Sequence, residues 1–338
     1  MTRALVVALG WLGLVSASPA AHPDDALIQS DALPERLQDL GLMRDGLTPM
    51  PGVAPYHLNT PLFSDYAEKF RFLYVPHGKH AAVTGDGLLA LPVGSVLIKT
   101  FAYPADLRAP ERDVRVVETR LLIHRAAGWI ALPYVWNADG TEATLRRAGT
   151  RLPISWVHKD GTTRTISYAV PNVNQCKGCH VRSGEMSPIG PKAANMDDGV
   201  QLQQLQKAGI VTGRLEGLHR LPAWDRPETG TVAQRARAYL EVNCGHCHNR
   251  AGPADTSGLW LDRDQVADAN LGIGKRPTAA GRGSMGMDFA IKPGDPGQSY
   301  LVARMESLEA GIAMPELGRA TVHEEGVALI RQWIGEMK

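Results

Sequence analysis

Apolar and polar positions in the first half of the chain follow patterns that are typical of β-strands. Runs rich in β-branched and aromatic residues, separated by Gly and Pro, cover residues 70–75, 95–103, 114–124 and 129–136. Asp160-Gly161 separates two further runs, residues 154–157 and 165–168, and this pattern predicts a hairpin. We therefore expect an antiparallel β domain over residues 58–170, built as a sandwich or a small barrel.

The pattern changes after Pro171, where strand-like runs stop. Residues 171–230 read as loops with short helices, including one helix from Gln201 to Ala208 and a linker over residues 222–230. Thr231 and Thr321 each begin a capping-box motif, and an amphipathic helical pattern follows each motif. Residues 231–338 are thus expected to begin and end with helices, and a bound group would organise the loop-rich segment between them.

The first residues have the pattern of a secretory leader. Arg3 precedes an apolar stretch over residues 4–15, and the small residues Ala17, Ser18 and Ala20 follow it. This predicts a signal peptide over residues 1–20 and export to the periplasm, and an uncleaved N-terminal anchor is the alternative. No later apolar run is long enough to span a bilayer, so a soluble mature protein without a transmembrane segment after the leader is expected.

Charge and motif content exclude several classes of function. Lys and Arg total 36 and Asp and Glu total 35, with no basic stripe, which argues against a nucleic-acid partner. The sequence also has no Gly-x-Ser-x-Gly elbow, no phosphate-binding loop and no His-Glu-x-x-His motif.

The four cysteines carry the candidate chemistry, because they form two Cys-x-x-Cys-His motifs. In this motif both thiols bond covalently to a haem and the histidine becomes an axial iron ligand. Two haem c cofactors are therefore predicted. Their ligands would be Cys176, Cys179 and His180 for the first haem, and Cys244, Cys247 and His248 for the second.

Two other uses of these cysteines stay open. Four cysteines in an exported protein commonly form disulfides. A structural zinc site could also use them with His246 and His248, but zinc requires its ligand pairs close together, and the sequence shows no neighbour for the first pair.

The sequence offers more than one candidate for the sixth ligand of each haem iron. Met314, on a Pro- and Gly-bounded loop before the last helix, is the candidate for the second haem, and a methionine of the core is the alternative. The first haem would have either no sixth ligand or one from the following set: Met186, Met196, His57, His77, His80, His124 and His158. An open sixth position would allow the iron to bind peroxide, oxygen or a small anion.

Several segments of the sequence resemble those of known proteins. Residues 231–338 resemble a class I cytochrome c domain, in which helices from the two ends cross beside the haem. Residues 243–249, 252–259 and 314–318 resemble an uncharacterised family of bacterial di-haem c-type cytochromes, and the likeness extends upstream through residues 174–180 to residues 59–66.

The resemblance implies an α+β fold class. An N-terminal antiparallel β domain would precede a loop-rich haem segment and a small all-α cytochrome c-like domain. In class I cytochromes a Gly-Pro follows the haem histidine at the spacing of Gly190-Pro191, which implies that the Pro191 carbonyl accepts from His180 Nδ1, with an ordinary turn as the alternative.

Three functions are compatible with these features. The first is electron transfer with a periplasmic redox partner protein, in which the β domain covers the first haem or docks the partner. The second is a di-haem enzyme, similar in size and haem number to bacterial di-haem peroxidases, with the first haem as the open reacting centre. The third is a binding module whose strands present Trp129, Tyr134, Trp136 and Trp156, although these side chains also suit a core.

Overall fold

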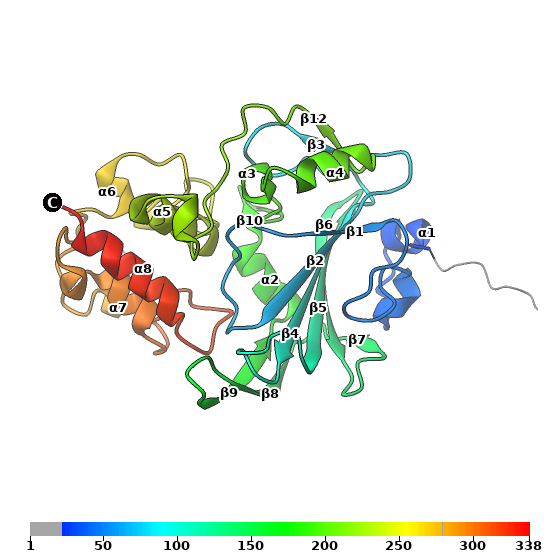
Figure 1. Cartoon of the computed structure of the whole chain (residues 1–338), viewed down its shortest axis with the longest axis horizontal. Coiled ribbons are helices and arrows are strands. Elements are labelled where there is room, and N and C mark those ends of the chain that lie inside the picture. The colour runs from blue at the N-terminus through cyan, green and yellow to red at the C-terminus, as the bar shows by residue number, and fades with distance from the viewer. Residues whose placement is uncertain (1–21, 279) are drawn as a thin grey trace, which may run out of the picture.

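A six-stranded antiparallel sheet forms the centre of the computed structural model, which describes residues 22–278 and 280–338 (Figure 1). The predicted signal peptide therefore lies outside the described residues. In spatial order the strands of the sheet are β1 (Val53–Tyr56), β2 (Glu68–Tyr74), β4 (Val96–Pro104), β5 (Val114–Arg125), β6 (Gly128–Trp136) and β7 (Ala143–Leu145). The sheet has two edges, β1 and β7, so it is open and not a barrel.

Both faces of the sheet are covered, which explains why β4 is an almost continuous apolar run. One face packs against the N-terminal segment, where Ile28, Leu37 and Leu40 are fully buried. The other face carries two apolar clusters, one at each end of its strands. The first contains Leu73 and Leu97, and packs against short helices, and the second contains Phe101 and packs against a hairpin.

The remaining strands form three small pairs, and all but one pair are antiparallel. The hairpin of β8 and β9 turns at Asp160-Gly161, as predicted. The pairs are β8 (Thr150–Val157) with β9 (Thr163–Val170), β10 (Val181–Arg182) with β11 (Glu185–Met186), and the parallel pair β3 (Ala81–Val83) with β12 (Val211–Gly213).

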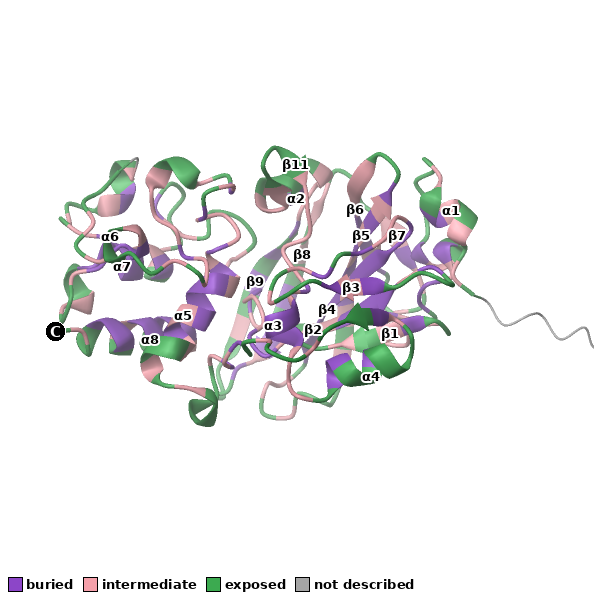
Figure 2. Cartoon of the chain, turned by 90° about the horizontal axis from the view of Figure 1, so that it is seen from above, coloured by how far each residue is buried: buried purple, intermediate pink, exposed green. Residues whose placement is uncertain are grey.

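Most of the helices are short. They are α1 (Asp25–Gln29), α2 (Val173–Cys179), α3 (Ala193–Met196), α4 (Gln201–Lys207), α5 (Val232–Asn243), α6 (Asp268–Leu271), α7 (Tyr300–Glu306) and α8 (Glu324–Gly335). The buried residues of α5, α7 and α8 share one core, and these helices lie on the side of the molecule opposite α1 (Figures 1 and 2).

Local sequence patterns predicted several helices correctly. The predicted helix at Gln201 is α4, and Thr231 caps α5 in the predicted capping box with Gln234. The second predicted capping box is wrong, because His323 is the N-cap residue of α8 and makes no capping hydrogen bond. Thr321 instead binds Asp65, a residue distant in sequence.

The predicted fold class, with a small all-α cytochrome c-like domain, is wrong. The chain is rich in β-structure, and no separate all-α unit is evident in the described residues. Residues 231–338 contain only two helices as long as twelve residues, and the segment between these helices is mostly loops. These loops and helices are joined to the β part through hydrogen bonds: the Phe63 N–H donates to Asn243 Oδ1, and the Ala320 N–H donates to Asp65 Oδ1.

Among the described residues, no helix combines the length and the apolar character that crossing a membrane requires.

Candidate functional site

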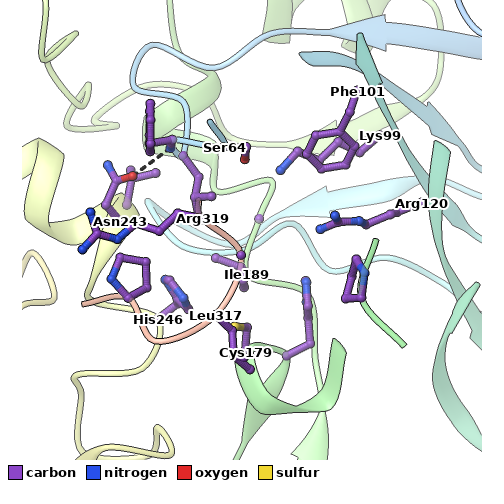
Figure 3. Close-up of a pocket in the computed structure, with 18 of the residues that line it drawn as sticks. Ser64, Lys99, Phe101, Arg120, Cys179, Ile189, Asn243, His246, Leu317 and Arg319 are labelled. Atoms are coloured by element: carbon purple, nitrogen blue, oxygen red, sulfur yellow. Dashed lines mark hydrogen bonds between the residues drawn. The ribbon is translucent and has the colours of Figure 1, made fainter. Parts of the chain in front are cut away.

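A cavity of about 400 Å³ lies where the sheet, α2 and the C-terminal helices meet. Its walls include residues of both Cys-x-x-Cys-His motifs, together with the loop that carries Met314. Figure 3 shows Cys179 and His246 on one side of this cavity, and Lys99 and Arg120 of the sheet on another. The motif residues that line the cavity are Cys176, Cys179, His180, Cys244 and His246.

The first motif is held by α2, a helix that begins with a capping box between Asn172 and Gln175. Cys176 and Cys179 are three residues apart on α2, which is about one helical turn. This is the spacing that two bonds to one haem require. Both thiols are free. His180 follows directly as the C-cap residue, so helix geometry fixes the positions of all three candidate ligands.

His180 has the hydrogen bond expected of an iron ligand, but its partner differs from the one implied by the resemblance. Its Nδ1 lies 3.1 Å from the carbonyl oxygen of Ser187, whereas the Pro191 carbonyl accepts from the Leu89 N–H. The reason is the β10–β11 hairpin, which returns the chain so that the Ser187 N–H also donates to the His180 carbonyl. With Nδ1 bound in this way, Nε2 is left for a metal.

The second motif follows α5. Cys244 caps this helix, and the backbone N–H groups of Cys247 and His248 both donate to the Cys244 carbonyl. Gly245 is required here, because a Cβ at this position would lie 2.7 Å from the Glu241 carbonyl oxygen. His248 Nδ1 lies 3.3 Å from Ser257 Oγ. Cys244 lines the cavity described above, whereas Cys247 and His248 do not.

Both motif histidines are half-buried, in surroundings that favour the neutral imidazole. Burial lowers the pKa of His180 to about 4 and that of His248 to about 4. Neutral imidazole is the form that binds a metal ion, so both side chains are ready to act as ligands near neutral pH.

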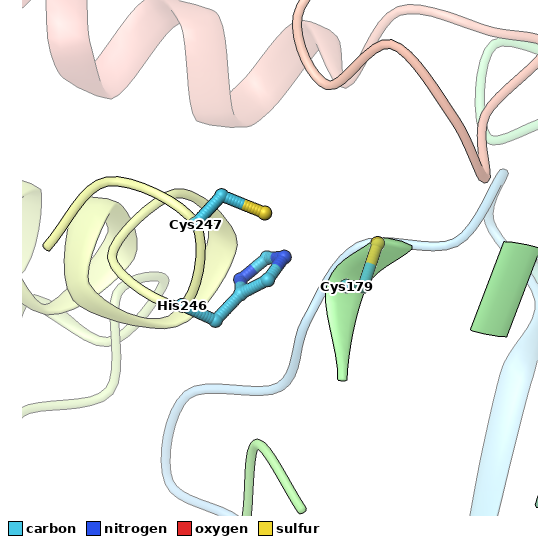
Figure 4. Close-up of side chains that lie close together, drawn as sticks. All are labelled: Cys179, His246 and Cys247. Atoms are coloured by element: carbon cyan, nitrogen blue, oxygen red, sulfur yellow. The ribbon is translucent and has the colours of Figure 1, made fainter. Parts of the chain in front are cut away.

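The two motifs adjoin each other in space. The candidate ligand atoms of Cys179, His246 and Cys247 all lie within 4.8 Å of one another (Figure 4). The Cys247 thiol and the His246 imidazole lower the pKa of the Cys179 thiol. The expectation that the first cysteine pair has no neighbour is therefore wrong.

The donor set fits haem attachment better than it fits structural zinc. A structural zinc site has four ligands, but only three gather here among the described residues. Each motif, by contrast, supplies the two free thiols and one half-buried imidazole that one haem c uses. His246 Nδ1 is buried and has no hydrogen-bond partner in the described part of the chain.

Met314 lines the cavity, whereas His248, the candidate ligand of the same haem, does not. None of the sixth-ligand candidates proposed for the first haem lines the cavity. His57 instead pairs with Asp198 at 2.9 Å, and Met196 is fully buried in an apolar cluster. The sequence-based set for the first haem is therefore not supported.

One cavity histidine, His323, was not recognised from the sequence, where it formed part of a predicted capping box. His246 was considered only as a ligand of the alternative zinc site. His323 stacks on Phe63 with ring centroids 4.2 Å apart, and its Nδ1 lies 3.0 Å from the Tyr239 hydroxyl. Burial lowers the pKa of His323 to about 4.

Comparisons with known proteins return no match to a protein-family model, to a curated protein or to a solved structure. The function is therefore argued from the geometry and donor chemistry of the site.

Proposed function

We propose that this protein is a di-haem c-type cytochrome that exchanges electrons with a redox partner protein in the periplasm. The observation that carries the proposal is that both Cys-x-x-Cys-His motifs meet, with Cys179 beside Cys247, and that four of their six ligand residues line one cavity. The predicted signal peptide is consistent with the periplasm, the compartment in which the partner is proposed.

Each motif residue has a defined role in this proposal. Cys176 and Cys179 would hold one haem through thioether bonds, and Cys244 and Cys247 would hold the other. His180 and His248 would bind the iron of these haems. Haem iron supplies one-electron exchange between its ferric and ferrous states.

The surrounding residues orient these ligands. The Ser187 carbonyl holds the proton on His180 Nδ1 and so fixes the tautomer that presents Nε2 to a metal. Ser257 Oγ occupies the equivalent position beside His248. Because the two motifs adjoin, the attachment sites are close enough to act together in electron exchange.

Haem attachment is tested on protein expressed with its leader in a host that matures c-type cytochromes. The alkaline pyridine spectrum should report two haems per chain, and mass spectrometry should find both on the cysteine-containing peptides. Replacing Cys176 and Cys179 with Ser should leave one haem, and so should replacing Cys244 and Cys247. A protein without thioether-bound haem would contradict the proposal.

The role of Met314 is tested by comparing two volume-conserving variants, Met314→Leu and Met305→Leu. Both methionines line the cavity, so Met305 provides a matched control. We expect Met314→Leu to abolish the absorption band of a methionine-ligated ferric haem and to lower the reduction potential of that haem. If Met305→Leu abolishes the band instead, the ligand is Met305.

One observation favours a second candidate, a metal centre at Cys179, His246 and Cys247. Metal analysis of the purified protein distinguishes the two candidates, because thioether bonds use the same sulfur atoms. One zinc per chain and no haem would establish the metal centre. Two haems per chain and no zinc would exclude it.

A further inference from the structure

Three basic side chains lie side by side on the face of the sheet that borders the cavity. Arg71 on β2 is the direct cross-strand partner of Lys99 on β4, and Lys99 is the partner of Arg120 on β5. Like charges placed directly opposite each other destabilise a sheet. A row of three cations therefore requires negative charge from elsewhere.

Among the described residues, only one of these three cations has a carboxylate partner. Glu118 pairs with Arg120, with Oε1 2.6 Å from Nε. Arg71 is 9% exposed and donates to the backbone carbonyl of Lys69. Lys99 lies 4.7 Å from the centre of the Phe101 ring, a contact that leaves its charge uncompensated. In the described part of the chain, no carboxylate forms an ion pair with Arg71 or Lys99.

Burial makes this arrangement costly. Burial lowers the pKa of Lys99 well below its ordinary value, and the charge of Arg71 lowers it further. An unpaired cation taken out of water tends to lose its proton, so the Lys99 ammonium is retained only with an anion beside it. Such an arrangement on a cavity wall points to an anionic group that occupies the cavity.

The row faces the first haem motif. Arg71, Lys99 and Arg120 line the same cavity as Cys176 and His180. The charge of Lys99 acts on the His180 imidazole, and the charge of Arg120 acts on the Cys176 thiol. The row also lies between the two apolar clusters of this face, so that charge is concentrated in the middle of the wall.

We propose that Arg71 and Lys99 bind a pair of carboxylates, those of the haem attached to Cys176 and Cys179. This inference rests on the proposed function. The two uncompensated cations match the two propionate carboxylates of one haem in number and sign. Arg71 offers a planar fork of donors that suits a carboxylate, and Lys99 offers a compact ammonium.

The test uses Lys99→Met and Arg71→Met in the haem-loaded protein, because methionine preserves an apolar stem without the charge. Arg115→Met is the control, since Arg115 also lies on a strand of the sheet, β5, and its replacement removes an exposed cation that does not line the cavity. The readouts are the two reduction potentials and the resonance Raman bending bands of the propionates. Pyridine spectra first establish that each variant holds two haems.

We expect one of the two haems to shift in each Met variant. Loss of a cation beside a propionate should favour the ferric state about tenfold, which corresponds to about 59 mV for one electron. The propionate bands should change in both variants and stay unchanged in Arg115→Met. Unchanged bands and potentials in variants that retain two haems would overturn the inference and leave the proposed function intact.

A small carboxylate free in solution is the other anion that fits Arg71 and Lys99. Succinate added to the wild-type protein should then change the ferric spectrum in a saturable manner, and Lys99→Met should abolish that response. This result would overturn the assignment to the haem propionates. The assignment to the propionates would be supported if the wild-type spectra do not respond to succinate and the propionate bands shift in the variants. Absence of haem from the wild-type protein would instead refute the proposed function.

Discussion

Glu118 is the residue whose loss should affect stability most clearly, because its carboxylate is completely buried. Its two oxygens accept from Arg120 at 2.6 and 2.8 Å, and Oε2 also accepts from the Tyr168 hydroxyl at 2.7 Å. Glu118→Gln keeps the shape of the side chain but removes its charge. Arg120 would then remain in the cation row with no carboxylate to neutralise it.

The expected cost follows from these contacts. Removing one partner of a buried ion pair costs about 3–5 kcal/mol, because the other charge is left unpaired. The Arg120 side chain is 31% exposed, so water recovers part of its solvation and the lower end of this range applies. We therefore expect Glu118→Gln to lower the free energy of unfolding by about 3 kcal/mol.

Urea unfolding followed by far-UV circular dichroism measures this change, with wild-type and variant proteins at the same haem content. The double variant Glu118→Gln/Arg120→Met has no unpaired cation. Its free energy of unfolding should therefore fall by less than that of Glu118→Gln alone. Glu111→Gln is the control, because Glu111 and Arg112 form an exposed pair 3.9 Å apart, and it should cost less than about 1 kcal/mol. A Glu118→Gln variant as stable as the control would refute the reasoning.

Three further predictions concern local features. Because burial lowers the pKa of His323 from 6.5 to about 4, the unfolded chain binds a proton there that the folded chain does not. Stability should therefore fall by at most about 3 kcal/mol as the pH falls from 6.5 to 4, and urea midpoints should show that His323→Gln removes this component. Gly252→Ala would press a Cβ against the carbonyl oxygen of Cys247 and should cost about 1–3 kcal/mol in urea unfolding, whereas Gly87→Ala, with open space around it, should be nearly neutral. Thr231→Ala removes the capping bond to the Gln234 N–H and should lower the thermal midpoint, at a cost of about 1 kcal/mol.

Elements with a strong local signal were predictable from the sequence. The apolar runs at residues 95–103 and 114–124 correspond to β4 and β5 within one or two residues, because their side chains fill both faces of the sheet. The Thr231 capping box marked the start of α5 for a similar reason, since its hydrogen bonds join residues three apart.

Features that depend on distant residues were not predictable. Thr321 matches a capping box, but the Asp65 carboxylate takes its hydroxyl and its backbone N–H, so the helix begins later. The contact of Cys179 with Cys247 likewise has no signal in the spacing of the two motifs.

The cation row shows why the candidate site was only partly predictable. Alternating basic residues on β2 and β5 have the pattern of a strand face in contact with water. Only the register of β2, β4 and β5 reveals that these charges adjoin and face a cavity. The two Cys-x-x-Cys-His motifs could be recognised in the sequence, whereas the cavity wall opposite the first motif could not.

The β part of the chain positions the candidate ligands as well as covering the cavity. Asp65 adopts a left-handed backbone conformation, with φ of 51°, and its Oδ1 accepts from the Ala320 N–H, the Thr321 N–H and the Thr321 hydroxyl. These bonds fasten the end of the loop that carries Met314 to the segment that leads into β2. A chain that lacks the β strands would therefore lose both the cation row and the anchor of the Met314 loop. This favours a structural role for the β part at the candidate site over a role as an independent binding module.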